Sequence, residues 1–117
     1  MAKFLFIYRG SPDEFQKLSP EEVQKHMQKW GSWIEEGFRK GWLVDPGDAL
    51  TPEGRLVNSK KVVTDGPFVE SKEVVGGYSV VQAETIDAAA QLAKSCPGLE
   101  TGGLVEVRVL AGLGSKP

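Results

Sequence analysis

The chain has 117 residues, of which 40% are hydrophobic and 26% are charged, a composition typical of a single globular domain. Fourteen Lys and Arg residues stand against sixteen Asp and Glu residues, so the formal net charge is -2. Such a chain has no excess of basic residues with which to neutralise phosphates, and we therefore expect no nucleic-acid partner.

The first strand is predicted for residues 3–9, where apolar side chains dominate. Its apolar run is shorter than a signal-peptide core and far shorter than a membrane span, so we expect a cytoplasmic protein that does not enter a membrane. Because side chains alternate along a strand, both faces are largely apolar and both should be covered. Phe4, Phe6 and Tyr8 share one face, and Leu5 and Ile7 share the other.

The first helix has a clear start and end in the sequence. Ser19 is the expected N-cap, Pro20 occupies the first helical position and Glu22 completes a capping box. Gly41 is expected to end the helix. An apolar stripe at helical spacing follows the cap and predicts the buried face. Its members are Val23, Met27, Trp30, Ile34 and Phe38.

The rest of the chain alternates between extended and helical patterns. Residues 42–50 are extended around an Asp-Pro-Gly-Asp turn, and residues 56–57 and 61–64 predict a hairpin. A strand is expected at 78–83 and another at 104–110. Between them, Thr85 caps a second helix whose apolar stripe runs from Ile86 to Cys96, and Pro97-Gly98 stops it.

This order predicts an α+β fold, a ferredoxin-like split βαβ sandwich that occupies residues 1–111 with a flexible tail at 112–117. Right-handed crossovers place both helices on one face of the sheet. The opposite face then needs a cover, and a second copy of the chain is the simplest one. We therefore expect a homodimer, a dimeric α+β barrel.

One long motif carries a resemblance to a known family. Residues 63–73 read Val-Thr-Asp-Gly-Pro-Phe-Val-Glu-Ser-Lys-Glu and are followed by Gly76-Gly77-Tyr78. With Ser19-Pro20-Glu21-Glu22, His26, Trp30, Cys96-Pro97 and residues 103–108, the chain resembles the DGPF branch of the YCII-related family. The resemblance implies a dimeric α+β barrel of largely undefined function. Some relatives are cofactor-independent enzymes acting on small ring compounds, and DGPF members are often encoded beside, or fused to, extracytoplasmic-function sigma factors.

The resemblance also implies a candidate catalytic residue. In the YCII branch a histidine of the first helix pairs with an aspartate further along that helix, and His26 matches the histidine. Arg39 stands where the carboxylate is expected, so the partner would have to be Asp65 or Glu35. The alternative is that His26 packs on Trp30 and hydrogen-bonds a backbone carbonyl.

Further residues are candidates for binding a small-molecule ligand. Glu106 and Arg108 share one face of the last strand, either as a mutually neutralising pair or as an anion-binding arginine held by its neighbour. The loop around Phe68 either lines a pocket or serves turn and dimer structure. The ligand-binding set is Tyr8, Trp30, Phe68, Tyr78, Glu106 and Arg108. One histidine and scattered carboxylates predict no metal site, and no cofactor motif is present in the sequence.

Two functional hypotheses follow from these residues. In the first, the chain is a dimeric small-molecule enzyme with His26 and Asp65 as acid and base. In the second, it is a non-catalytic ligand-binding or regulatory dimer that contacts a partner such as a sigma factor. The sequence position of Arg39 motivates the second hypothesis.

Overall fold

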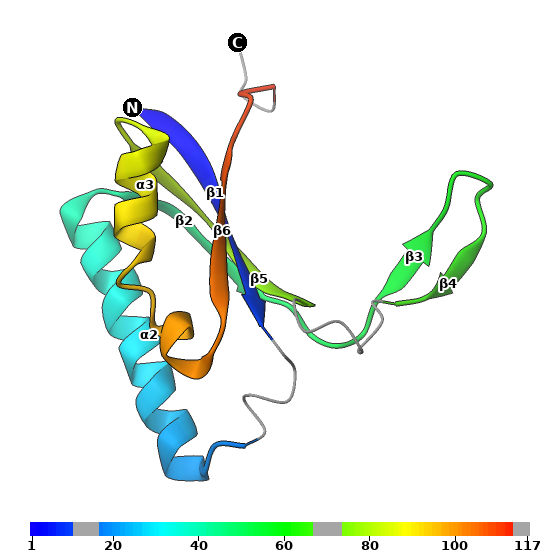
Figure 1. Ribbon diagram of the computed structural model, residues 1–117, viewed down its shortest axis with the longest axis horizontal. Helices are drawn as coiled ribbons and strands as arrows, with labels where there is room; N and C mark the ends of the chain where they lie inside the picture. The colour runs from blue at the N-terminus through cyan, green and yellow to red at the C-terminus, as the bar shows by residue number, and fades with distance from the viewer. Residues whose placement is uncertain (11–16, 67–73, 114–117) are drawn as a thin grey trace.

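A computed structural model describes residues 1–10, 17–66 and 74–113. Within these residues, four strands form the main sheet, accompanied by two helices and a short 3₁₀ turn, and a separate two-stranded hairpin projects from the body (Figure 1). In chain order the elements are β1 Ala2–Gly10, α2 Pro20–Lys40, β2 Leu43–Ala49, β3 Arg55–Val57, β4 Val63–Asp65, β5 Val74–Ala83, α3 Ile86–Ala93, η1 Pro97–Thr101 and β6 Leu104–Val109.

The main sheet has the strand order β2-β5-β1-β6, and every neighbouring pair is antiparallel. Both helices contribute to one core on the same face of this sheet (Figure 1). The α+β class is therefore confirmed, and the strand order is consistent with the ferredoxin-like arrangement. Within the described residues, no helix is long and apolar enough to span a membrane.

Helix α2 begins as the sequence predicts. The side chain of Ser19 accepts a hydrogen bond from the backbone of Glu22, the Glu22 carboxylate accepts one from the backbone of Ser19, and Pro20 follows the cap. Gly41 ends the helix with a φ of 83°, a conformation that glycine adopts without strain. The capping box and the helix end are therefore confirmed.

The buried face of α2 differs from the predicted stripe. His26, Trp33 and Gly37 are its buried residues, whereas Met27 is 57% exposed and Phe38 is 51% exposed. Trp33 stacks on Phe6 of the sheet, with ring centroids 6.4 Å apart. The side of α2 that carries Trp33 therefore faces the sheet, instead of the side that carries Met27 and Phe38. The prediction that Met27 and Phe38 lie in the core is therefore wrong.

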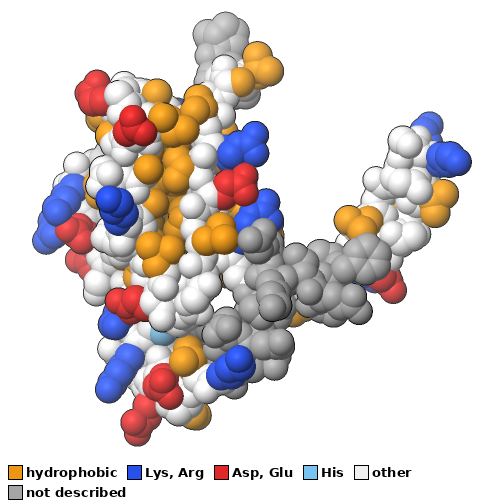
Figure 2. Space-filling model, viewed as in Figure 1, with side chains coloured by type: hydrophobic (Ala, Val, Ile, Leu, Met, Phe, Trp, Pro, Cys, Tyr) orange, Lys and Arg blue, Asp and Glu red, His pale blue; other side chains and the backbone are white. Residues whose placement is uncertain are grey.

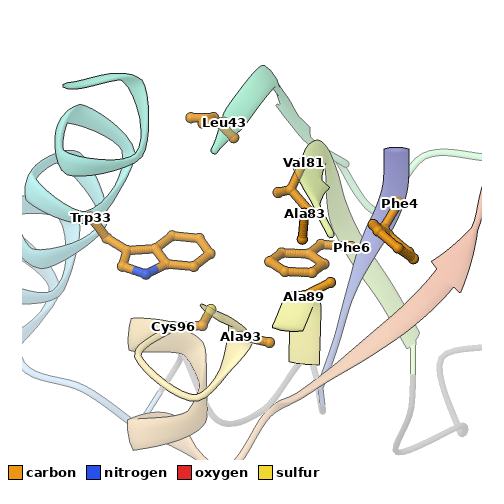
Figure 3. Packing of buried hydrophobic residues seen from close by; sticks show 9 residues of the cluster. All are labelled: Phe4, Phe6, Trp33, Leu43, Val81, Ala83, Ala89, Ala93 and Cys96. Carbon is orange, nitrogen blue, oxygen red and sulfur yellow. The ribbon is translucent and has the colours of Figure 1, made fainter. Parts of the chain in front are cut away.

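The core lies between the sheet and the two helices (Figure 3). Trp33 reaches from α2 toward Phe6, while small residues of α3 let that helix approach the sheet closely. Ile86, predicted to join the stripe of α3, is 45% exposed. The buried cluster comprises Phe4, Phe6, Trp33, Leu43, Val81, Ala83, Ala89, Ala93 and Cys96.

Two segments between α2 and β5 depart from a simple sheet. Strand β2 pairs with β5 through two register shifts around its Asp-Pro-Gly sequence, where Asp45 accepts a hydrogen bond from the backbone of Gly47. Strands β3 and β4 form the predicted hairpin, closed by a turn in which Asn58 donates its backbone N–H to Val62. This hairpin extends away from the sheet and helices (Figure 1).

Candidate functional site

The candidate residues lie in three places. His26, Trp30 and Tyr8 are on the side of the sheet that the helices cover. Tyr78, Glu106 and Arg108 belong to the opposite face, which the helices leave open. Asp65 ends strand β4 of the projecting hairpin, and Phe68 lies outside the described residues.

His26 is 8% exposed and lies one helical turn before Trp30. The indole Nε1 of Trp30 lies 2.9 Å from Nε2 of His26. An indole nitrogen can only donate, so Nε2 of His26 must be the acceptor and the proton of a neutral ring lies on Nδ1. A neutral histidine acts as a general base through its unprotonated nitrogen. Here that nitrogen is Nε2, and it already accepts the hydrogen bond from Trp30.

Tyr8 is anchored on the same side of the sheet. Its ring meets Trp30 edge-on, with centroids 4.9 Å apart. Its hydroxyl donates to Ser79 Oγ at 2.8 Å, and that hydroxyl donates in turn to the carbonyl oxygen of Pro46, also at 2.8 Å. Burial raises the pKa of Tyr8 far above its ordinary value, more than the Ser79 hydrogen bond lowers it. The phenol therefore stays neutral, and its hydrogen bonds link β1 to β5 and, through Ser79, to β2.

Asp65 occupies a very different environment. Its side chain is 94% exposed, and its carboxylate lies 3.5 Å from the guanidinium of Arg55 on the neighbouring strand. The two residues are direct cross-strand partners in the hairpin. Within the described residues, the structure therefore places Asp65 in an ion pair on the projecting hairpin and His26 in a contact with Trp30.

The helix-free face of the sheet carries an apolar centre. Alternation along β1 turns Leu5 and Ile7 away from the helices, because Phe4 and Phe6 enter the core. Leu5 lies opposite Val80 of β5, and Ile7 lies opposite Tyr78. These two cross-strand pairs of apolar side chains lie in the middle of the open face.

Charged side chains border this apolar centre. Arg9 Nε lies 2.8 Å from Oε1 of Glu106, and Nη1 of Arg108 lies 3.1 Å from Oε2 of the same carboxylate. The hydrogen bonds from Arg9 and Arg108 lower the pKa of Glu106 below its ordinary value, so this carboxylate stays ionised at neutral pH. Figure 2 shows a different part of the surface, where hydrophobic side chains gather over α3 and toward β6.

Sequence reasoning did not name Arg9, Leu5 or Ile7 as parts of a site. The signal was present, since all three share one parity in β1 and period two places them on one face with Lys3. The pairing of Arg9 with Glu106 could not be read from the sequence, because it depends on the register of β1 against β6.

The described part of the chain offers little support for metal binding or for a cysteine nucleophile. It contains no group of three or more His, Cys, Asp or Glu residues that could hold a metal ion. Cys96 is buried, and this burial raises its thiol pKa to about 11, only partly opposed by backbone hydrogen bonds at Gly98 and Leu99. Such a thiol carries little thiolate near neutrality and is a poor nucleophile.

The fold and its faces together define an α+β domain with one face of its sheet packed under helices and the other left open. The model of the YCII-related domain matches residues 2–111, and the chain belongs to that family. The family expected from the sequence is thereby confirmed, while the DGPF branch stays a prediction. Comparison with curated proteins gave no match.

Proposed function

We propose that the protein works as a homodimer in which the helix-free faces of two sheets meet and enclose a pocket for a small molecule. The observation that carries this proposal is the apolar centre of that face, formed by the pairs Leu5–Val80 and Ile7–Tyr78. Burial of apolar surface contributes about 25 cal/mol per Å², so a second copy that covers this centre gains stability from it.

The surroundings of the apolar centre fit the same proposal. Tyr78 within the centre is 39% exposed, and Leu104 and Leu110 of the neighbouring strand and its end are 40% and 38% exposed. The ion-paired Glu106 beside them would give the enclosed space a polar wall as well as an apolar one. Small-molecule pockets commonly combine these two features, with apolar walls for affinity and few polar groups for orientation.

Within this proposal we favour binding over catalysis by a His26–Asp65 pair. Catalysis would require Nε2 of His26 to give up the hydrogen bond from Trp30, and Asp65 to leave its ion pair with Arg55. A general base must also reach the proton that it abstracts. The ligand-binding dimer needs neither rearrangement, and a regulatory partner such as a sigma factor remains part of that hypothesis.

Sedimentation velocity of the wild-type protein and two variants tests the dimer. We expect a dimer at micromolar concentration for the wild type, and loss of the dimer in Ile7→Lys, which places a charge in the apolar centre. Met27→Lys adds the same charge at an exposed position of α2 and should leave the dimer intact. A wild-type protein that sediments as a stable, folded monomer would overturn the proposal, whatever the variants do.

A further inference from the structure

The helix-free face also contains an open groove next to the charged cluster. Its lining consists of Met1, Lys3, Val80, Leu110 and residues 111–113. The backbone N–H of Leu110 donates to the carbonyl oxygen of Lys3 at 3.1 Å, so these two residues are neighbours across β1 and β6. The groove therefore has largely apolar walls and one cationic side chain.

Arg108 stands beside this groove. It lies directly opposite Leu5 in the register of β1 and β6, which makes it the diagonal neighbour of Lys3. Its side chain is 67% exposed. A guanidinium has five N–H donors. Among the described residues, Arg108 donates one hydrogen bond, from Nη1 to Glu106. Several donors of Arg108 can therefore serve a ligand while Glu106 holds the side chain in place.

The charges of this face are unevenly distributed over its strands. The acidic residues Asp45 and Asp48 lie on β2, and β5 separates them from β1. On β1 and β6, Arg9 is paired with Glu106, and the positive charges of Lys3 and Arg108 lie beside them, a local excess of positive charge. If two such faces meet, as proposed above, each copy brings this excess into a space with less water. Charges removed from water need partners of opposite sign, and an anion between Lys3 and Arg108 would supply one.

We infer that this groove binds a small organic carboxylate, with the carboxylate held by Lys3 and Arg108 and the apolar body lying against Val80 and Leu110. The inference rests on the proposed function, because it names the class of ligand for the same face. Planar, bidentate recognition of a carboxylate is the interaction for which a guanidinium is best suited, and the nearby ammonium adds charge without fixing direction.

Titration of the ¹⁵N-labelled protein with hexanoate, monitored by NMR, tests this inference. Hexanamide is the matched uncharged probe. Hexanoate should give saturable shifts centred on Lys3, Leu5, Val80 and Leu110, and hexanamide should bind at least about tenfold more weakly, because hydrogen bonds to charged groups are the stronger ones.

Substitutions separate the two cationic groups from general charge effects. Arg108→Gln and Lys3→Gln should each weaken hexanoate binding by about tenfold or more. Arg39→Gln removes an arginine from the last turn of α2 and should leave hexanoate binding unchanged. Equal binding of hexanoate and hexanamide, or equal effects of Arg108→Gln and Arg39→Gln, would overturn the carboxylate site.

The same samples distinguish failure of this inference from failure of the dimer. A protein that sediments as a dimer but shows no saturable hexanoate shifts up to millimolar concentrations refutes the carboxylate site and leaves the dimer standing. A monomer with saturable shifts at Lys3 and Leu110 refutes the dimer and supports the site. A monomer without such shifts refutes both.

Discussion

Trp30 donates its indole N–H to Nε2 of His26 at 2.9 Å, one turn earlier on the same helix. This contact makes His26 part of the aromatic packing above the sheet, where Trp30 also meets Tyr8. His26→Leu would leave a partly buried indole donor without its acceptor, which typically costs about 1–3 kcal/mol. His26→Gln keeps an acceptor oxygen and should lose less.

Urea unfolding of these variants at one fixed protein concentration measures the loss. Met27→Leu changes the adjacent exposed residue and should alter the free energy of unfolding by no more than about 0.5 kcal/mol. If His26→Leu were as stable as Met27→Leu, the hydrogen bond would contribute nothing to the fold.

The two glycines inside α2 should respond in opposite directions to alanine. A Cβ at Gly31 meets nothing within 4 Å, so Gly31→Ala should stabilise the protein by up to about 1 kcal/mol through helix propensity. A Cβ at Gly37 would lie 2.9 Å from both Leu43 and Trp42. Trp42 is held by packing on Trp33, so Gly37→Ala should destabilise the protein by about 1–3 kcal/mol, less the gain in helix propensity. Thermal unfolding of the two variants compares them directly, and the same sign of change in both would contradict the close approach at Gly37.

The pH dependence of stability should depend on Glu106. Its folded-state pKa is lowered by the hydrogen bonds from Arg9 and Arg108, so its contribution is present at neutral pH and is lost as pH falls below the ordinary pKa of a glutamate and through the lowered folded-state pKa. The wild type should therefore exceed Glu106→Gln in stability at pH 7, and the difference should shrink toward pH 3. Urea midpoints across this range test it, with Glu53→Gln as the control for overall charge. A difference that grew on acidification would mean that the sign is wrong.

Cys96 should be unreactive in the native protein. With its thiol pKa raised to about 11 by burial, the thiolate fraction is lower by roughly two orders of magnitude than for an ordinary cysteine, before access is considered. A disulfide reagent at pH 7.5 should label the urea-unfolded chain at once and the native protein at least about 100-fold more slowly. Rapid labelling of one thiol per native chain would show that Cys96 is accessible.

Local signals in the sequence predicted the elements better than they predicted their faces. The capping box of Ser19 and Glu22 and the hairpin around Asn58 depend on residues close in the chain, and both are confirmed. The predicted stop of the second helix at Pro97 is wrong, because α3 already ends at Ala93 and Pro97 begins the 3₁₀ turn η1. The buried face of α2 was predicted less well, because this helix has apolar residues on more than one side. Only the packing of Trp33 against Phe6 decides which of them enter the core.

The candidate site shows the same division. The sequence identified chemically distinctive residues, such as His26, Asp65 and Arg108, but their distribution over two sheet faces and a hairpin depends on strand register and on where the hairpin extends. The Trp30 contact of His26 was anticipated as the packing alternative, and the structure adds which ring nitrogen it uses. The link between Arg9 and Glu106 joins residues 97 positions apart, and no local pattern could supply it.

The projecting hairpin of β3 and β4 lies between two halves of the chain, and strands from both halves alternate in the main sheet. The first half supplies β1 and β2, and the second supplies β5 and β6, with β5 between the two strands of the first half. Lys60 and Lys61 lie in the exposed turn of the hairpin, where trypsin can cut. A cut there would leave each fragment hydrogen-bonded to strands of the other, so the nicked protein should stay assembled. The same turn is accordingly the natural point at which to express the chain as two complementing fragments.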